Sequence, residues 1–465
     1  MSQNASPSIA VFDLGKTNSK LFVIAADGMI LAERRTRPVW QDRDGLRVLD
    51  DAHLFSWMQA QLNDLSDGYD VSGIMFSGHG CTFGLVENGA LAAPMLDYEQ
   101  EPPVDVAARI DGLLPSFSET FSPNLPLGLN YGRHILWLKD RDPALLERAE
   151  TILAYPQFWS WRFSGTAVSE VSYLGCHSHL WAPLKDDYSS LVDAEGWRAK
   201  MPPMARAGSA VGTWRTQGGR KLTVHNGVHD SNAALYYYRS VGFSDFTLVS
   251  TGTWVIIFNS ACPLEALDPE RDMLANVTVD HQPTATIRFM GGREYDIASG
   301  GWNKPVSLEA VAAVIAKGIV ALPSFAAGGP MPGEGSFVGP AAEGEERAAA
   351  ALLYVALMTD LSLDLIRSEN DIVIDGGLVK TGLYPGLLAT LRPQQRVLIS
   401  AVAEGSALGA AALAFEASGI SAFTSECRQA KPVVVPGLDA YRNRWISLAE
   451  SRDSILVQPV REARA

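Results

Sequence analysis

Four short segments carry residue types that could bind phosphate or move a proton. The first is Asp13-Leu14-Gly15-Lys16-Thr17-Asn18-Ser19-Lys20, in which a carboxylate follows the apolar run Ile9 to Phe12 and precedes a glycine turn. Amides exposed in such a turn can receive phosphate oxygens, and a carboxylate beside them can hold Mg²⁺. The same segment also fits an ordinary hairpin with an aspartate in its turn. Taken alone, it leaves both interpretations open.

Two further glycine turns strengthen the phosphate interpretation. Ser250-Thr251-Gly252-Thr253 follows a second apolar run and offers a similar set of amides and hydroxyls. Asp375-Gly376-Gly377-Leu378-Val379-Lys380 ends a third apolar run with two glycines, against which a flat ligand could pack because no Cβ intervenes. The alternative for each is a structural turn with ordinary glycines. Two phosphate turns in corresponding places are harder to explain as structural turns than one.

The fourth segment is Gly227-Val228-His229-Asp230-Ser231-Asn232, in which Asp230 stands where a helix is expected to begin. An N-cap is the common structural role of such an aspartate. The functional alternative is a general base, kept ionised by the helix N-terminus, that orients an attacking hydroxyl.

The elements that must position these residues occur twice. Strand, polar turn, strand is expected at Ile9 to Phe12, Leu21 to Ala25 and Met29 to Ala32, and again at Phe246 to Val249 and Trp254 to Phe258. Gly73 to Phe76 likewise corresponds to Asp371 to Ile374. The sequence therefore predicts a duplicated α/β protein with domains 1–242 and 243–465 and the ligands between them.

Helices are expected over five amphipathic or small-residue segments, and the Gly- and Pro-rich stretch from Pro323 to Gly344 is expected to be a loop. The expected helices are Asp51 to Leu65, Asp142 to Ala149, Asp230 to Tyr238, Glu345 to Arg367 and Ser406 to Glu416.

Composition and charge exclude several classes of function. The 465 residues are 47% hydrophobic and 19% charged, which is typical of a globular protein. The net charge of −14, without a run of Lys or Arg, argues against nucleic acid as a partner. We find neither a membrane span of about 18 apolar residues nor a signal peptide, so no membrane partner and a cytoplasmic location are expected. The four widely spaced cysteines predict reduced thiols rather than disulfides or a zinc site.

Together the four segments resemble the FGGY carbohydrate kinases, and the resemblance covers nearly the whole chain. Ile135 to Lys139 with Asp142-Pro143 and Ser164-Gly165 resembles the family's first-domain signature, and Glu404 to Ala411 resembles its C-terminal helix. The resemblance implies a duplicated actin-like ATPase (ribonuclease H-like) fold with an active-site cleft between the domains. It also implies ATP and Mg²⁺ as cofactors and transfer of the γ-phosphoryl group to a hydroxyl of a small sugar.

The resemblance also assigns roles to individual residues. Asp13 would hold Mg²⁺, and Asp230 would be the catalytic base. The cofactor-binding residues would be Gly15, Lys16, Thr17, Asn18, Lys20, Thr251, Gly252, Thr253, Gly376, Gly377 and Lys380. The sugar-binding residues would be His79, Gly80, Asp97, Tyr98, Glu99 and His229.

Three features depart from the family pattern. Lys16 stands where most members have threonine or a small residue, and Glu170 stands where many have aspartate. The segment Leu174 to Trp181 matches no family motif. Its His177 and His179 could face one ligand, although core or surface histidines are favoured over a metal site.

The substrate is the least determined feature. His229-Asp230 and Ser250 to Trp254 resemble the rhamnulokinase and fuculokinase branch, which implies a 6-deoxy-ketohexose such as L-fuculose or L-rhamnulose. A pentulose or polyol kinase of the same family is the first alternative, and a catalytically inactive sugar-binding regulator is the second. A homodimer is left open.

Overall fold

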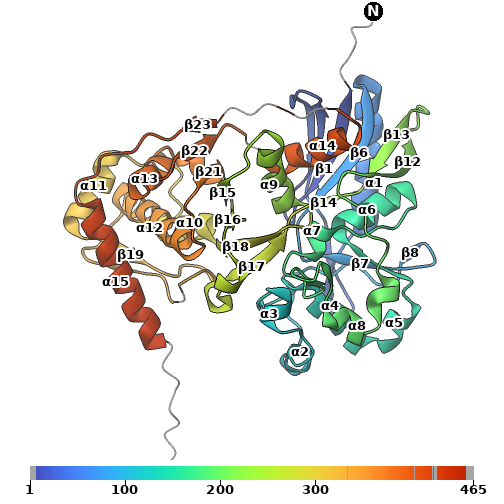
Figure 1. Ribbon diagram of the computed structural model, residues 1–465, viewed down its shortest axis with the longest axis horizontal. Helices are drawn as coiled ribbons and strands as arrows, with labels where there is room; N and C mark the ends of the chain where they lie inside the picture. The colour runs from blue at the N-terminus through green and yellow to red at the C-terminus, as the bar shows by residue number, and fades with distance from the viewer. Residues whose placement is uncertain (1–6, 332, 403, 421–422, 424–426, 457–465) are drawn as a thin grey trace, which may run out of the picture. The chain divides into compact units, whose positions relative to one another are not determined.

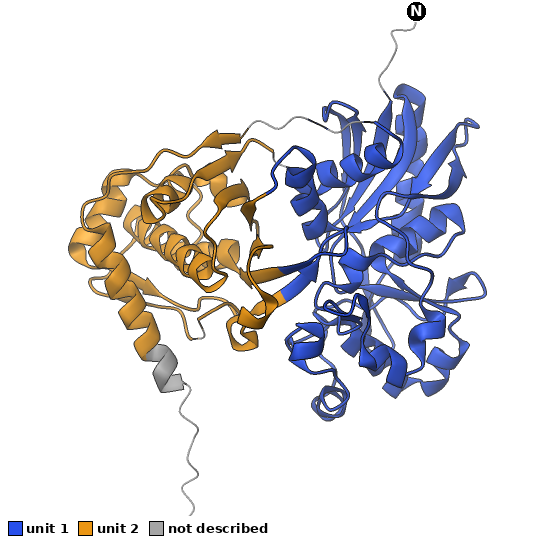
Figure 2. Cartoon of the chain, in the orientation of Figure 1, with its two compact units in different colours: residues 1–244, 275–284, 404–425 blue, residues 245–274, 285–403, 426–465 orange. Residues whose placement is uncertain are grey.

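The computed structural model describes residues 7–331, 333–402, 404–420, 423 and 427–456. It divides into two compact units, coloured separately in Figure 2. Unit 1 comprises residues 1–244, 275–284 and 404–425, and unit 2 comprises 245–274, 285–403 and 426–465. The first change of unit falls two residues beyond the predicted boundary at 242, and the chain then returns to unit 1 twice.

The sheet of unit 1 has seven strands, with β1 and β6 at its centre (Figure 1). β1 pairs antiparallel with β2 and parallel with β6, which also pairs with the short strand β14. Phe12 of β1 stacks on Phe76 of β6, with ring centroids 5.6 Å apart, so the central strands are fixed by an aromatic core. The strands are β1 (Ser8–Leu14), β2 (Ser19–Ala25), β3 (Ile30–Thr36), β6 (Val71–Gly78), β12 (Ala210–Arg215), β13 (Lys221–His225) and β14 (Val228–His229).

The second sheet also has seven strands, and β15 and β21 are central in it. β15 pairs antiparallel with β16 and parallel with β21, which pairs parallel with β22. The strands are β15 (Phe246–Thr251), β16 (Val255–Asn259), β17 (Met273–Val277), β18 (Pro283–Phe289), β21 (Asp371–Gly376), β22 (Val397–Ser400) and β23 (Cys427–Gln429).

The two sheets repeat one topology. The order β3-β2-β1-β6-β13-β12 in the first sheet corresponds to β18-β16-β15-β21-β22-β23 in the second, where β17 is added beyond β18. The parallel and antiparallel pairings agree at each step. The predicted duplication is therefore confirmed.

Helices cover the sheet of unit 1, and Figure 1 shows α9 (Asp230–Ser240) and α14 (Gly405–Ala417) on one face, with α1 (Asp51–Gly68) and α6 (Tyr155–Ser164) on the other. α14 packs on both α9 and β1, although it comes from the far end of the chain. A Cβ at Gly409 would lie 1.8 Å from the carbonyl oxygen of Ala233, so only glycine permits this close helix crossing.

The helix at the centre of unit 2 is α12 (Gly344–Leu365), which packs on α10 (Gly291–Ser299), α11 (Leu308–Lys317) and α13 (Tyr384–Leu391). The described residues contain one helix that could cross a membrane by length and mean hydropathy, and it is α12. Its most apolar 18-residue window has a mean hydropathy of 1.6 and is 83% buried within the protein. α12 is therefore a core helix, and it coincides with the helix predicted over Glu345 to Arg367.

The predicted elements agree with the structure to within a few residues, with one exception. The stretch expected to be a loop contains β20 (Ser336–Val338), which pairs with β19 (Val320–Leu322). Three residues flanked by glycines give too short a pattern to predict a strand. The remaining elements are β4 (Trp40–Arg43), β5 (Leu46–Leu49), β7 (Phe83–Glu87), β8 (Ala90–Leu91), β9 (Thr151–Ala154), β10 (Trp181–Ala182), β11 (Asp187–Tyr188), α2 (Val104–Asp111), α3 (Phe117–Thr120), α4 (Tyr131–Arg141), α5 (Pro143–Arg148), α7 (Val171–Leu174), α8 (Ser190–Ala194) and α15 (Leu438–Leu456).

Candidate active site

The carboxyl ends of three parallel strands bring the candidate chemistry of unit 1 together. In the register of the sheet, Asp13 of β1 and Val228 of β14 both lie opposite Ser77 of β6. Asp230 follows β14 directly as the first residue of α9. The two carboxylates, predicted separately from the sequence, therefore stand at the same edge of the sheet, where ligands of open α/β sheets commonly bind.

The ionised form of Asp13 is disfavoured in the folded protein. The pKa of Asp13 is raised to about 7, mainly by burial and then by the charge of Asp230, while the charge of Lys20 acts in the opposite direction. Lys20 lies opposite Asp13 across the β1–β2 hairpin and donates to Glu404, with Nζ–Oε distances of 2.7 and 3.0 Å. A buried carboxylate with a second one nearby is the kind of oxygen donor that Mg²⁺ prefers, so the residues present fit that ion.

Within the described part of the chain, no group of three or more His, Cys, Asp or Glu side chains is arranged to hold a metal ion.

Asp230 is less strongly ionised than the helix N-terminus alone would make it. Its Oδ1 accepts from the amide and hydroxyl of Ser231, at 2.6 and 3.1 Å. Burial nevertheless raises the pKa of Asp230 to about 6. Desolvation therefore outweighs the helix terminus, but a carboxyl group with a pKa of about 6 is still mostly ionised at pH 7. The N-cap of α9 is His229, not Asp230.

The ring of His229 is fixed in one tautomer. The Asn232 amide Nδ2 lies 3.0 Å from Nδ1 of His229, and an amide nitrogen can only donate, so Nδ1 accepts. The ring proton is consequently on Nε2, which lies 3.3 Å from Oδ1 of Asp230 and 3.5 Å from Sγ of Cys176. Burial lowers the pKa of His229 to about 3, so the ring is neutral.

His79 and Gly80 lie beside the same group. The Nδ1 atom of His79 donates to the carbonyl of Gly80 at 2.7 Å, and burial lowers the pKa of His79 to about 4. A Cβ at Gly80 would lie 3.2 Å from Nε2 of His229. His79 also packs on Tyr98, with ring centroids 5.4 Å apart. These four predicted sugar residues are therefore neighbours in unit 1.

The turn between β1 and β2 is closed by a hydrogen bond from the Gly15 amide to the carbonyl of Asn18, at 3.0 Å. Thr17 and Asn18 are exposed at its tip. Lys16 is not directed outward with them, because its ammonium is bonded to the carboxylate of Asp97. The structure thus separates Lys16 from the other residues predicted to line the phosphates.

In unit 2, the end of β15 is tied to the end of β21. The buried hydroxyl of Thr251 donates to the carbonyl of Asp375 and accepts from the amide of Leu378, the latter at 3.1 Å. Because this hydroxyl is used within the protein, Thr251 supports the turn, while Gly252 and Thr253 are left to line the adjacent pocket.

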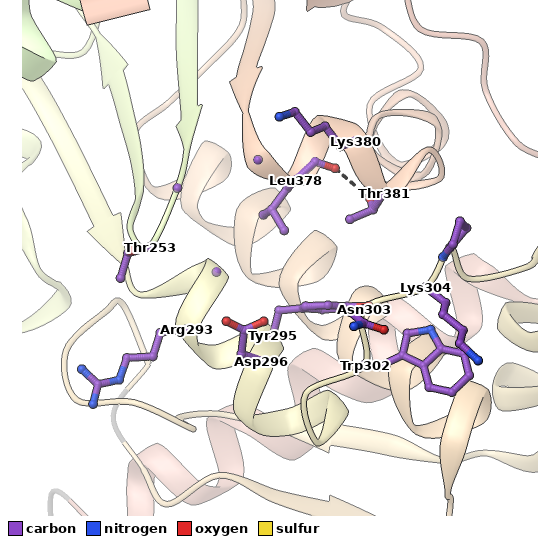
Figure 3. A pocket seen from close by; sticks show the side chains of 14 residues that line it. Thr253, Arg293, Tyr295, Asp296, Trp302, Asn303, Lys304, Leu378, Lys380 and Thr381 are labelled. Atoms are coloured by element: carbon purple, nitrogen blue, oxygen red, sulfur yellow. Dashed lines mark hydrogen bonds between the residues drawn. The ribbon is translucent and has the colours of Figure 1, made fainter. Parts of the chain in front are cut away.

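That pocket has a volume of about 610 Å³. Figure 3 shows Leu378 and Thr381 on one wall and Tyr295 and Asn303 on the other. Its lining residues, all in unit 2, are Gly252, Thr253, Gly292, Arg293, Tyr295, Asp296, Trp302, Asn303, Lys304, Pro305, Gly377, Leu378, Lys380 and Thr381. Six cofactor-binding residues were predicted in this half of the chain, and four of them line the pocket. The other two, Thr251 and Gly376, are not among the lining residues.

The sequence reasoning missed the wall formed by residues 292–305. A signal was available, because Gly291-Gly292 opens helix α10 shortly after strand β18, much as Gly376-Gly377 lies at the end of β21. A glycine pair between a strand and a helix N-terminus is typical of a phosphate-binding turn.

Gly376→Ala should destabilise unit 2 strongly. The residue has φ of +87°, and an added Cβ would lie 1.8 Å from the carbonyl oxygen of Thr251. Displacing the backbone of β15 and adopting this φ should together cost on the order of 3 kcal/mol or more. Gly382→Ala is the matched control, because its φ of +80° is similar but nothing lies within 4 Å of the added Cβ. Thermal unfolding should show a much larger loss for Gly376→Ala, and equal losses would contradict the packing argument.

Glu170 and His177, which depart from the family pattern, make structural contacts. Glu170 is buried as the N-cap of α7, where it accepts from the amides of Ser172 and Tyr173. Nδ1 of His177 lies 2.7 Å from the carbonyl of Leu129, and His179 is buried. The contact of His177 favours its structural interpretation.

Comparisons with known proteins agree with this arrangement. Residues 243–422 match the family described as carbohydrate kinase FGGY, C-terminal domain. A carbohydrate kinase from Novosphingobium aromaticivorans is 34% identical, with a TM-score of 0.85 over 96% of this chain and 99% of that one. A xylulose kinase from Rhodospirillum rubrum, at 16% identity, shares the fold with a TM-score of 0.79 over 97% of this chain and 100% of that one.

Two curated relatives are more distant. The L-fuculokinase of Salmonella typhi is 24% identical over 267 residues, and that of Escherichia coli (strain K12) is 23% identical over the same length. Each alignment covers 54% of this chain and 56% of the relative, so the chain spans about half the length of the curated relatives it matches. The full-length similarity to the Novosphingobium protein, the family match and the duplicated fold lead to one conclusion: the chain belongs to the FGGY family of carbohydrate kinases.

Proposed function

We propose that the chain transfers the γ-phosphoryl group of ATP to a hydroxyl of a small sugar. The observation that carries this proposal is the placement of Asp13 and Asp230 at one edge of the unit 1 sheet. One carboxylate suits a cation, and the other suits a hydroxyl. Phosphoryl transfer needs little more from a protein than these two tasks and accurate positioning of both substrates.

In this proposal Asp13 would hold Mg²⁺, which when bound would neutralise negative charge on the phosphates. Asp230 accepts the proton of the attacking hydroxyl and orients it. The Nε2 atom of His229 lies 3.3 Å from Oδ1 of that carboxylate. The pocket of unit 2 takes the nucleotide, with Gly377 and Lys380 beside it.

We further propose a 6-deoxy-ketohexose, phosphorylated on its primary hydroxyl, as the substrate. The similarity to two L-fuculokinases supports this class, as does the His229-Asp230 pair. A family resemblance determines the reaction better than the substrate, so the choice needs a direct test.

A substrate screen provides that test. ADP formation is measured with ATP and Mg²⁺ against L-fuculose, L-rhamnulose, pentuloses and polyols. The fastest turnover is expected with a 6-deoxy-ketohexose. A pentulose or polyol as best substrate would refute the substrate class but not the kinase. Sugar binding without ADP formation from any of them would indicate a regulator and refute the activity.

Turnover should fall as the pH decreases from 7 to 5. Burial raises the pKa values of Asp13 and Asp230 to about 7 and about 6, and both carboxylates must be ionised to act. Two interacting groups titrate as a pair, so the acid limb of log kcat/KM should approach a slope of two. A profile that stays flat to pH 5 would contradict the assignment of these half-buried carboxylates to catalysis.

A further inference from the structure

The ammonium of Lys16 lies inside a cage of aromatic rings and carboxylates. Its Nζ is 4.2 Å from the ring centroid of Trp40 and 4.8 Å from that of Tyr98. It bonds to the carboxylate of Asp97 and lies 3.8 Å from an oxygen of Glu99. Two ring faces and two carboxylates stabilise a cation well. Binding a phosphate would require this ammonium to give up these contacts.

The cage is rigid on several sides. The Asp97 side chain is only 1% exposed, and its second oxygen accepts from Nε of Arg47 at 3.0 Å. The indole Nε1 of Trp40 donates to the carbonyl of Lys16 at 3.3 Å, which holds the backbone as well. The Lys16 side chain is 14% exposed. Burial lowers the pKa of Lys16 to about 8, and the ammonium stays mostly protonated at pH 7.

The cage borders the residues proposed to bind the sugar. Tyr98 contacts Lys16 on one side and packs on His79 on the other. The amide of Glu99 donates to Asp97 at 2.9 Å, while the Glu99 side chain is 60% exposed. Lys16 therefore contacts an aromatic ring that packs on His79 and lies near an exposed carboxylate that can accept hydrogen bonds from hydroxyl groups.

The charges of this cluster are balanced. Lys16 and Arg47 are positive, Asp97 and Glu99 are negative, and each cation already contacts a carboxylate. Neither cation is left to bind the carboxylate of a sugar acid. A neutral polyhydroxy compound, which needs hydrogen-bond acceptors and ring faces, suits the cluster better.

We propose that Lys16 is a positioning residue for sugar recognition rather than a phosphate ligand, and that the sugar it helps to select is neutral. This inference rests on the proposed function. It differs from the role that the family resemblance implied, because the side chain of Lys16 contacts the 97–99 segment instead of lying with the exposed tip of its own turn.

The test measures the effect of Lys16 on sugar binding separately from its effect on nucleotide binding. Lys16→Met keeps an unbranched stem between the rings but removes the charge, Lys16→Arg keeps the charge, and Lys221→Met is a control at an exposed strand position. Thermal shift titrations with neutral ketoses, polyols and aldonates, and separately with Mg·ADP, measure binding without requiring turnover. KM values for sugar and Mg·ATP are then compared.

Lys16→Met should weaken sugar binding roughly tenfold or more and leave Mg·ADP binding within about twofold, while Lys16→Arg should retain most sugar affinity. The role of Lys16 is refuted if Lys16→Met weakens Mg·ADP binding instead of sugar binding, or if it changes neither affinity. The inference also fails if the wild type binds Mg·ADP but none of the sugars, or if an aldonate is the tightest-binding sugar.

Two controls keep the outcomes distinct. If Lys16→Met does not fold, Glu99→Gln replaces it, because this carboxylate is exposed; an unchanged sugar affinity there would count against the inference. If the wild type binds sugar but forms no ADP, the proposed kinase activity fails while the role of Lys16 in sugar binding can still be decided.

Discussion

Asp230→Asn should lower kcat by about 10²–10⁴-fold, which is the typical contribution of a positioned general base. The amide has nearly the shape of the carboxylate, and its oxygen can still accept from the amide and hydroxyl of Ser231. It cannot accept the proton of the attacking hydroxyl. Since the nucleotide pocket lies in unit 2, binding of Mg·ADP should stay within about twofold of wild type.

Ser231→Ala is the matched control for Asp230→Asn. It removes one hydrogen bond to Asp230 but leaves the carboxylate and the Ser231 amide in place, so kcat should fall by less than about tenfold. Steady-state kinetics and calorimetric titration with Mg·ADP measure the two effects. Turnover of Asp230→Asn close to that of wild type would refute the assignment of the base.

Asp13→Asn should lower turnover by about 10²-fold or more, because removing one preorganised charge from a phosphoryl-transfer site commonly costs this much. The same change should stabilise the metal-free protein at neutral pH. Burial raises the pKa of Asp13 to about 7, so the folded chain holds a proton that the unfolded chain releases near pH 4. Folding stability attributable to this group therefore decreases as pH rises from about 4 to 7.

The expected gain from Asp13→Asn is on the order of 2–4 kcal/mol above pH 7 and close to zero below pH 4, since a tenfold difference in proton affinity corresponds to about 1.4 kcal/mol. Urea unfolding in the presence of a chelator measures it. Asp42→Asn, at an exposed position, should change neither stability nor turnover. A variant that is less stable than wild type at pH 8 would contradict the electrostatic account of Asp13.

The duplicated fold could be predicted from the sequence because each half repeats a strongly patterned core. Ile9 to Phe12 and Phe246 to Val249 are short apolar runs between polar turns, and both became central strands. Asp13 and Asp230 were identified from residue type and family resemblance. Their meeting at one edge depends on the pairing of β1, β6 and β14, which no local pattern specifies.

Three features of the structure could not be predicted from the sequence, because they depend on contacts between residues that are distant in the chain. Lys16 and Asp97 are 81 positions apart, so nothing in the first turn indicates where its lysine is directed. The raised pKa of Asp230 depends on burial, which outweighs the helix terminus that the sequence does reveal. Residues 404–425 belong to unit 1 because α14 packs on α9, which a single boundary near 242 does not anticipate.

The most direct test of the central claim follows the phosphoryl group itself. The protein is incubated with ATP, Mg²⁺ and the best sugar from the screen, and the products are observed by ³¹P nuclear magnetic resonance. The account predicts a sugar phosphate monoester that accumulates in equal amount to ADP, and no monoester with Asp230→Asn. Formation of ADP with orthophosphate alone, or no consumption of ATP by a folded protein that binds both substrates, would contradict it.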